Sequence, residues 1–209
     1  MENELLCSLA LNAAFGYEPH ISRRLIDHLG SAAAVFALTP AERAGLLGPK
    51  AALLHEGLLE KARQEWQRIE GLGCRFVPLT DPAFPPLLKE CPDAPVGLYV
   101  RSETPPERLF ANPHPVAVIG TRDISPYGKA VTEQLVAALA GAGVRPCIVS
   151  GLAFGVDITA HEAALARGLP TIAVLPVGID EVYPWRHRDS AARIAAAPDS
   201  ALVSDFPPG

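Results

Sequence analysis

An arginine and a glycine follow directly on the apolar segment 115–119 of this chain. Gly120 lets the backbone turn closely, Thr121 offers a hydroxyl, and the guanidinium of Arg122 offers a fork of donors suited to phosphate. Ser125 and the helix expected after it add backbone N–H groups at the positive end of a helix dipole. The segment is therefore either an anion-binding site or a tight turn beside a surface arginine.

A second glycine-containing turn follows the next apolar segment. Ser150 and Gly151 end that segment, and Gly155 gives another permissive backbone position. Asp157 either caps the following helix or accepts a proton from His161, which lies four residues on and on the same helix face. An Asp–His pair suits general acid–base catalysis, but no companion nucleophile is evident. We therefore favour a structural hydrogen bond that stiffens the loop.

Aromatic and basic side chains accompany both later turns. Phe154 is either a packing residue or an exposed ring that stacks on a base, a contact worth about 1–3 kcal/mol. The loop 183–188, YPWRHR, suits either a platform for a single strand or a packed loop with solvated arginines. The fingerprint GxGxxG does not follow the first apolar segment, and no acidic residue closes the second. We therefore expect no dinucleotide cofactor.

The elements that position these turns alternate between strand and helix from residue 116 onward. The segments PVAVIG, PCIVSG, PTIAVLPVG and ALVSDF are continuous apolar runs, as in strands buried on both faces. This rhythm predicts an α/β domain over 116–209, a Rossmann-like, mostly parallel sheet with helices on both faces. Ligands bind beyond the carboxyl ends of such strands, so we expect the turns at 120–128, 150–157 and 176–184 to form one site.

Residues 1–72 read as a small helical domain of the helix-hairpin-helix or SAM-like kind, with apolar residues at three- and four-residue spacing. Ser22 is a candidate cap for its second helix, Gly30 a candidate end, and Ser31 a candidate start for the next. Thr39, Pro40 and Glu42 form a typical helix start. Residues 73–115 form a proline-rich connector with two short strands, CRFVPL and GLYVRS.

The overall composition limits the possible partners. The 209 residues carry a net charge of −5 and are 49% hydrophobic, so any nucleic-acid contact must be a local groove. The four cysteines form no CxxC pair, which favours reduced, mostly buried thiols over a disulfide framework or a metal site. No basic leader precedes a long apolar stretch, and no apolar run approaches the roughly 20 residues that span a bilayer. We expect a soluble, cytoplasmic protein without membrane contact.

Four motifs in order resemble the DNA-processing protein A family, also called DprA or Smf. They are VAVIGTR with YG, IVSGLAFGVDITAH, TIAVLPVGIDEVYP and the closing LVSDFPPG. The similarity covers most of residues 74–209, and the N-terminal helices match more loosely. It implies a protein that binds and protects single-stranded DNA in natural transformation and helps to load the RecA recombinase. It implies no catalysis and no cofactor.

The resemblance also assigns sites. The 120–122 turn would contact the DNA backbone, and the 150–155 turn would form the neighbouring wall of the pocket. Many members have Lys or Arg where this chain has Phe154, so stacking would replace one phosphate contact. Each lost contact removes roughly 0.7 from the log–log salt slope for a single strand. The candidate DNA-binding residues are Gly120, Thr121, Arg122, Tyr127, Gly128, Ser150, Gly151, Phe154, Gly155 and Asp157.

The family's sheet continues past FPPG through a basic, asparagine-containing segment and often a winged-helix tail. We therefore expect this chain to be truncated at its C-terminus, and the family's homodimer and RecA contacts depend largely on that later region. The alternative function is that of a nucleoside-monophosphate phosphoribohydrolase-like enzyme, a class that carries a PGGxGT-type turn before a glutamate, which this chain does not have. The N-terminal helices are a third candidate, as an independent contact module.

Overall fold

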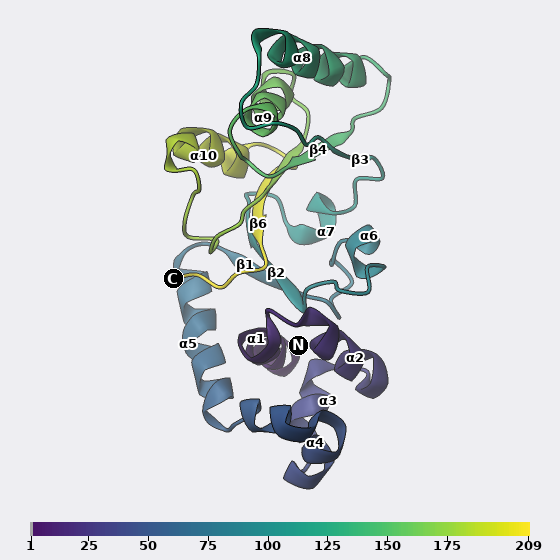
Figure 1. The fold of residues 1–209 in the computed structure, drawn as a ribbon, viewed down its shortest axis with the longest axis vertical. Coiled ribbons are helices and arrows are strands. Elements are labelled where there is room, and N and C mark those ends of the chain that lie inside the picture. The colour runs from purple at the N-terminus through teal and green to yellow at the C-terminus, as the bar shows by residue number, and fades with distance from the viewer. Residues whose placement is uncertain (1) are drawn as a thin grey trace. The chain divides into compact units, whose positions relative to one another are not determined.

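The computed structural model describes residues 2–209, which divide into two compact units (Figure 1). One unit runs to Tyr99, and the other comprises Val100–Pro207. The boundary falls inside strand β2 (Gly97–Arg101), within the proline-rich segment that follows the helices. Over the described residues, every helix is too short or too polar to cross a bilayer.

The first unit is mainly helical. Its elements are α1 (Glu2–Phe15), α2 (Pro19–Leu29), α3 (Ala32–Ala37), α4 (Pro40–Leu47), the 3-10 helix η1 (Gly48–Leu53), α5 (Gly57–Gly71), β1 (Arg75–Pro78) and α6 (Pro86–Lys89). Three expected helix boundaries are confirmed. Gly30 ends α2 with φ +87°, the Ser31 side chain accepts from the Ala34 amide, and Thr39 and Glu42 form a capping box.

The expectation that Ser22 caps α2 is wrong. The helix begins at Pro19, three residues earlier, because proline is preorganised for the first helical position. Ser22 consequently lies inside the helix and is 1% exposed. The N-cap residue is Glu18, whose side chain makes no capping hydrogen bond.

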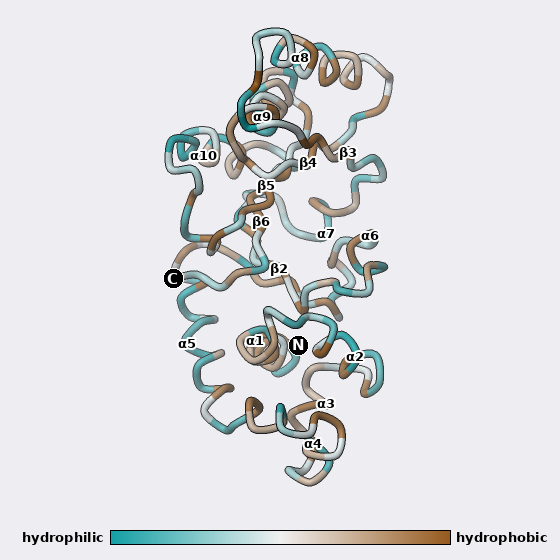
Figure 2. The backbone as a smooth tube through the Cα atoms, viewed as in Figure 1, coloured by the Kyte–Doolittle hydropathy of each residue, from teal (hydrophilic) through white to brown (hydrophobic). Residues whose placement is uncertain are grey.

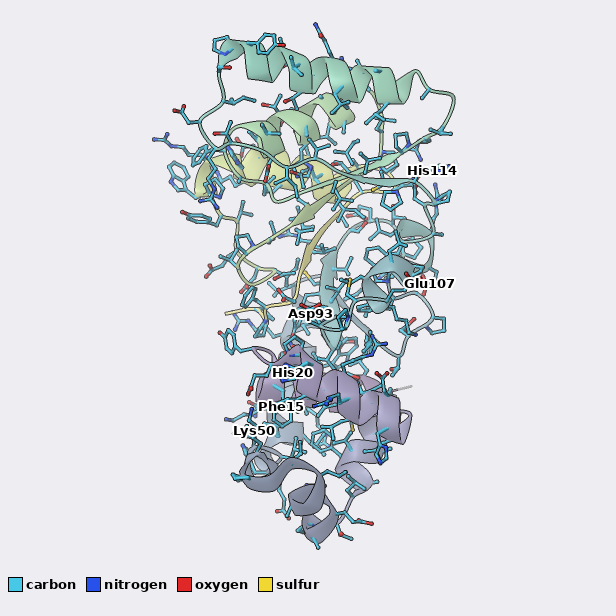
Figure 3. All side chains as sticks on the ribbon, turned by 45° about the vertical axis from the view of Figure 1, so that its right-hand side comes forward. Phe15, His20, Lys50, Asp93, Glu107 and His114 are labelled. Carbon is cyan, nitrogen blue, oxygen red and sulfur yellow. The ribbon has the colours of Figure 1, made fainter. Side chains whose placement is uncertain are left out.

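Buried leucine and aromatic side chains hold the first unit together. Leu9, Phe15 (labelled in Figure 3) and Ile69 are all at most 2% exposed. Tyr99 is fully buried with its polar end satisfied: its hydroxyl accepts from the Asn12 amide at 3.1 Å and donates to the Glu65 carboxylate. Burial raises the pKa of Glu65. This polar network lets the unit bury a tyrosine without leaving its hydroxyl unpaired.

The second unit is an α/β fold with parallel strands, as predicted. Its elements after β2 are α7 (Pro106–Leu109), β3 (Pro115–Ala117), α8 (Pro126–Ala140), β4 (Cys147–Ser150), α9 (Val156–Ala166), β5 (Thr171–Val174), the 3-10 helix η2 (Trp185–His187), α10 (Arg188–Ala196) and β6 (Ala201–Ser204). Strands β3, β4, β5 and β6 are neighbours in that order, and each of these pairs is parallel. Their carboxyl ends therefore lie along one edge.

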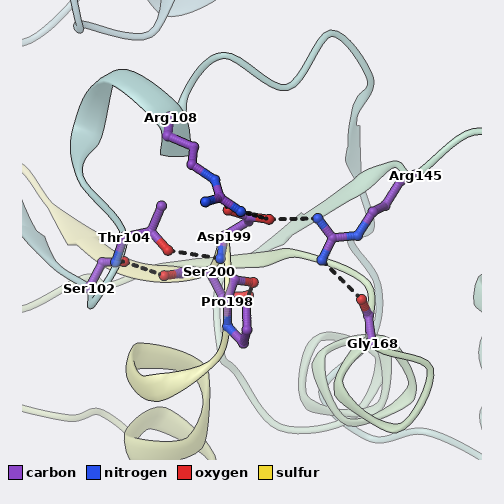
Figure 4. Close-up of polar contacts among 8 residues, drawn as sticks. All are labelled: Ser102, Thr104, Arg108, Arg145, Gly168, Pro198, Asp199 and Ser200. Carbon is purple, nitrogen blue, oxygen red and sulfur yellow. Dashed lines mark hydrogen bonds and ion pairs between the residues drawn. The ribbon is translucent and has the colours of Figure 1, made fainter.

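Helices α9 and α10 pack on these strands and contact each other. Helix α8 packs on α9, which contacts α10, and α7 lies across the strands from α9 and α10 (Figures 1 and 4). A core cluster joins β3 and β4 to α8 and α9, and its buried members include Val118, Val136, Ile148 and Ala160. The hydropathy colouring of β4 and β5 shows the same apolar character (Figure 2). Burial of this cluster fixes the strand ends from which the candidate turns emerge.

A charged cluster ties down the opposite edge of the sheet (Figure 4). Asp199 accepts from Arg145 at 2.6 Å and pairs with Arg108 at 2.8 Å, and its backbone amide donates to the Thr104 hydroxyl at 2.9 Å. Arg145 also donates to the Gly168 carbonyl. The hydrogen bond to Arg145 is the main reason why the pKa of Asp199 is lowered. This cluster fastens α7 and the loop before β6 to the start of β4.

Candidate nucleic-acid interface

The 120–122 turn leaves one strong donor group free. Val118 still pairs with β4, since its amide donates to the Val149 carbonyl at 2.9 Å, and the chain then turns at Gly120. The Thr121 hydroxyl accepts from the Asp123 amide at 3.1 Å, which closes the turn. Arg122 is exposed, and its guanidinium makes no hydrogen bond or ion pair within residues 2–209. A guanidinium without an internal partner is available to an anion.

The 150–155 turn is braced from within. Asp157 lies in the first turn of α9, and its Oδ2 accepts from the amides of Gly151 at 3.1 Å and Ala153 at 3.4 Å. The carbonyl of Leu152 faces Nδ1 of His187 at 2.7 Å. Phe154 is 41% exposed, and its ring meets the His187 imidazole edge-on, with centroids 4.8 Å apart. The turn thus presents an aromatic ring at a defined place.

The two turns touch through their backbones. The Val156 amide donates to the Thr121 carbonyl at 3.1 Å. A Cβ on Gly155 would lie 2.1 Å from that carbonyl oxygen and 2.9 Å from the Arg122 carbonyl carbon, and Gly155 has φ +78°. A Cβ on Gly120 would lie 2.5 Å from the Val156 side chain. Glycine is therefore required where the two turns meet.

Arg122 and the 150–155 turn share one cleft of about 240 Å³. It is lined by Arg122, Gly151, Ala153, Phe154, Asp157, Val174, Pro176, Tyr183 and Pro184. Arg122 and Asp157 are the charged residues of this lining, and Asp157 is 7% exposed with its carboxylate already accepting two amides. Arg122 is therefore the exposed charge of the cleft, whereas the buried carboxylate of Asp157 is bonded to the 151–153 loop. Its volume is below the roughly 300–1,000 Å³ of typical small-molecule pockets.

The expectation that Asp157 stiffens the loop is confirmed, but the expected helix cap and the expected partnership with His161 are wrong. Gly155, not Asp157, is the N-cap of α9, and Asp157 braces the preceding loop instead. His161 is fully buried, and its Nδ1 lies 2.7 Å from the Thr171 hydroxyl. That hydroxyl donates its own hydrogen to the Ile148 carbonyl, so its oxygen accepts from Nδ1–H of His161. The histidine is thus held toward the sheet.

Several other candidates lie outside the cleft. The Ser150 side chain is 4% exposed and donates to the Val118 carbonyl at 2.6 Å, so it joins β4 to β3. Tyr127 and Gly128 lie in the first turn of α8 and do not line the cleft. The Gly128 amide donates to the Ser125 side chain, so it is not free for an anion. Among the candidates, the cleft brings together Arg122, Gly151, Phe154 and Asp157.

The cleft also contains residues of the third turn expected at this site, 176–184, which were not among the candidate DNA-binding residues, and it contains Val174, which was not expected. Val174 and Pro176 follow from the end of β5, and Tyr183 and Pro184 come from the loop after it. The sequence signal that could have identified Val174 is its position, because residues at the carboxyl end of a central parallel strand lie at the ligand-binding edge of the sheet. In the part of the chain that the structure describes, no three metal-ligating side chains gather at one place.

We expect Gly155→Ala to destabilise the second unit far more than Gly168→Ala. Both glycines have positive φ, but a Cβ on Gly168 meets nothing within 4 Å. The control should cost roughly 1 kcal/mol, the conformational term alone, and Gly155→Ala at least about 2 kcal/mol more because the Thr121 carbonyl must move. Equilibrium urea unfolding measures both. Equal losses would contradict the close approach of the two turns.

His161 should make stability depend on pH. Burial lowers its pKa from 6.5 to about 4, so between these values the unfolded chain binds a proton that the folded chain does not. Stability is fully present above pH 6.5 and falls as the pH drops toward 4, by about 2 kcal/mol between pH 7 and pH 5. Urea unfolding at these two pH values should show a smaller loss in His161→Asn. An identical loss in both proteins would refute the buried neutral histidine.

Comparison with known proteins places this geometry in a family. Residues 75–209, well over half of the chain, match the family model of DNA recombination-mediator protein A. The chain is 38% identical over 132 residues to Protein Smf of Escherichia coli, covering 63% of this chain and 33% of that protein. It is 37% identical over 131 residues to DNA processing protein DprA of Streptococcus pneumoniae, covering 63% and 43%. The chain thus spans about a third of the length of several curated relatives.

Solved structures agree in fold. The X-ray structure of DNA processing protein A from Streptococcus pneumoniae matches with a TM-score of 0.68 and 30% identity, over 82% of this chain and 58% of that one. DNA processing protein A from Helicobacter pylori, solved to describe its single-stranded DNA binding mode, matches with a TM-score of 0.51 and 35% identity, over 60% and 54%. On the extent of the family match, this chain belongs to the DNA recombination-mediator protein A family.

Proposed function

We propose that this protein is a non-enzymatic DNA-processing protein that binds single-stranded DNA in the cleft between the 120–122 and 150–155 turns. The observation that carries the proposal is the free guanidinium of Arg122 beside the exposed ring of Phe154 in one cleft. Phosphate suits the guanidinium, and a base face suits the ring. The single-stranded DNA binding mode of the Helicobacter pylori relative supports the same ligand class.

Aromatic exposure around the cleft favours an unpaired strand over a duplex. Phe154, Tyr183 and Trp185 are 41%, 59% and 65% exposed, and all three follow the carboxyl ends of β4 and β5. The faces of bases are open to stacking only when a strand is unpaired, and each stacked base contributes about 1–3 kcal/mol. The Arg188 guanidinium lies 5.1 Å from the Trp185 ring centroid, which adds a cation to this loop. The chain is acidic overall, so its affinity depends on this local site.

The chemistry of the cleft supports binding without catalysis. Its one carboxylate, Asp157, already accepts two loop amides, and the Ser150 hydroxyl is buried against the Val118 carbonyl. These groups hold the turns in place, which is the task of a binding site. From the family we further propose assistance to RecA loading in natural transformation, a cytoplasmic location and a homodimer. The candidate contacts of Gly120, Thr121 and Tyr127 belong to the same proposal, as an extension of the cleft along the strand.

Arg122→Ala should weaken binding of labelled oligo-dT about ten-fold or more, because a charged hydrogen bond to phosphate is lost. The log–log salt slope should also fall by roughly 0.7. Fluorescence anisotropy at two salt concentrations measures both quantities, with a duplex of equal length as the comparison ligand. Arg167→Ala is the matched control, since Arg167 is exposed beyond the far end of α9 and outside the cleft. Unchanged affinity and slope in Arg122→Ala would remove this residue from the site.

A further inference from the structure

One peptide unit in the 150–155 turn is held at both ends. The Leu152 carbonyl faces Nδ1 of His187 at 2.7 Å, and the Ala153 amide donates to Oδ2 of Asp157 at 3.4 Å. The carbonyl and the amide of a trans peptide point in opposite directions, so two partners on opposite sides fix the rotation of the whole plane. Asp157 comes from the helix that follows the turn, whereas His187 comes from η2, 35 residues after Leu152.

Leu152, which contributes the carbonyl of this peptide, has a backbone conformation that needs such restraint. Leu152 has φ +56°, in the left-handed region that residues with a Cβ rarely adopt, and its side chain is fully buried. Relaxation of Leu152 to negative φ would rotate the 152–153 peptide. That rotation would break the hydrogen bonds to His187 and Asp157 and carry Phe154 away from its place. The native turn therefore depends on partners that favour the left-handed form.

His187 contacts the turn twice. It is 9% exposed, and because a carbonyl oxygen only accepts, its Nδ1 must carry the hydrogen. The same imidazole packs against the Phe154 ring at an interplanar angle of 69°. It therefore restrains both the backbone that precedes Phe154 and the orientation of the ring itself. His187 does not line the cleft.

We infer that His187 is a positioning residue for the DNA-binding turn: its Nδ1–H holds the 152–153 peptide, and its ring aims Phe154 toward the cleft beside Arg122. The inference rests on the proposed function, because it concerns how the same cleft meets a base. It gives the loop after β5 a second role, in addition to the proposed stacking of its aromatic side chains on DNA bases. Arg122 supplies the charge, and His187 fixes the distance and angle at which the aromatic ring lies from it.

The test compares three substitutions of His187. The side-chain amide of His187→Asn places an N–H donor close to the position of Nδ1 but removes the ring, so oligo-dT affinity should fall only about two- to three-fold, the effect of the lost ring contact with Phe154. His187→Gln places its amide one bond further out, and His187→Leu has no donor. Both should bind oligo-dT at least about five-fold more weakly in fluorescence anisotropy. His114→Leu is the control, since His114 is exposed and lies before β3 (Figure 3).

Hydrogen exchange of the protein without DNA gives the second readout. The Ala153 amide should exchange at least about ten-fold faster in His187→Gln and His187→Leu than in wild type and His187→Asn, while amides of β4 and β5 stay unchanged. If His187→Leu fails to fold, the Asn and Gln variants carry the comparison. Wild-type affinity and exchange in His187→Gln would overturn the positioning role. Absence of oligo-dT binding by the wild type would instead refute the proposed function, whatever the exchange shows.

Discussion

The contact of Gly155 with the backbone of Thr121 and Arg122 is the constraint on which the candidate site depends. Each partner comes from a separate strand end, and the hydrogen bond from Val156 to Thr121 closes the distance until no Cβ fits between them. Through this contact the guanidinium of Arg122 and the ring of Phe154 open into one cleft. Without this contact, the sheet would still place both turns on one edge, but the Arg122 guanidinium and the Phe154 ring would not line the same cleft.

Asp157 and His161 make internal hydrogen bonds near this contact, and Arg122 is the exposed charge of the cleft lining. The Asp157 carboxylate accepts hydrogen bonds from two loop amides, and His161 donates to Thr171, with burial lowering the pKa of His161 to about 4. Both are therefore structural groups rather than an acid–base pair. Such a site attracts an anion because the Arg122 guanidinium is exposed in the cleft. This local attraction is possible even in a chain with a net charge of −5.

The sequence predicted the class of fold and the meeting of the turns because both follow from local rules. Continuous apolar strands with short links imply a parallel sheet, and carboxyl ends of parallel strands share an edge. The hydrogen-bond partners of Asp157, His161 and His187 could not be predicted from the sequence. Helical spacing shows that Asp157 and His161 share a face, but the hydrogen-bond partners of Asp157 depend on how the loop folds back, and the partner of His161 depends on which strand lies below. His187 was named only as one of the aromatic and basic residues of the 183–188 loop, and tertiary packing buries it under the turn.

The most direct test of the central claim is a titration of the isotope-labelled protein with oligo-dT, followed by NMR of its backbone amides. Binding in the cleft predicts that the largest shift changes fall on the 120–122 and 150–155 turns and on the neighbouring loop at 183–185. Amides at the opposite edge of the strands, around Arg145 and Asp199, should stay unchanged. Shift changes concentrated on the N-terminal helices or around Asp199, with the two turns unaffected, would contradict the account.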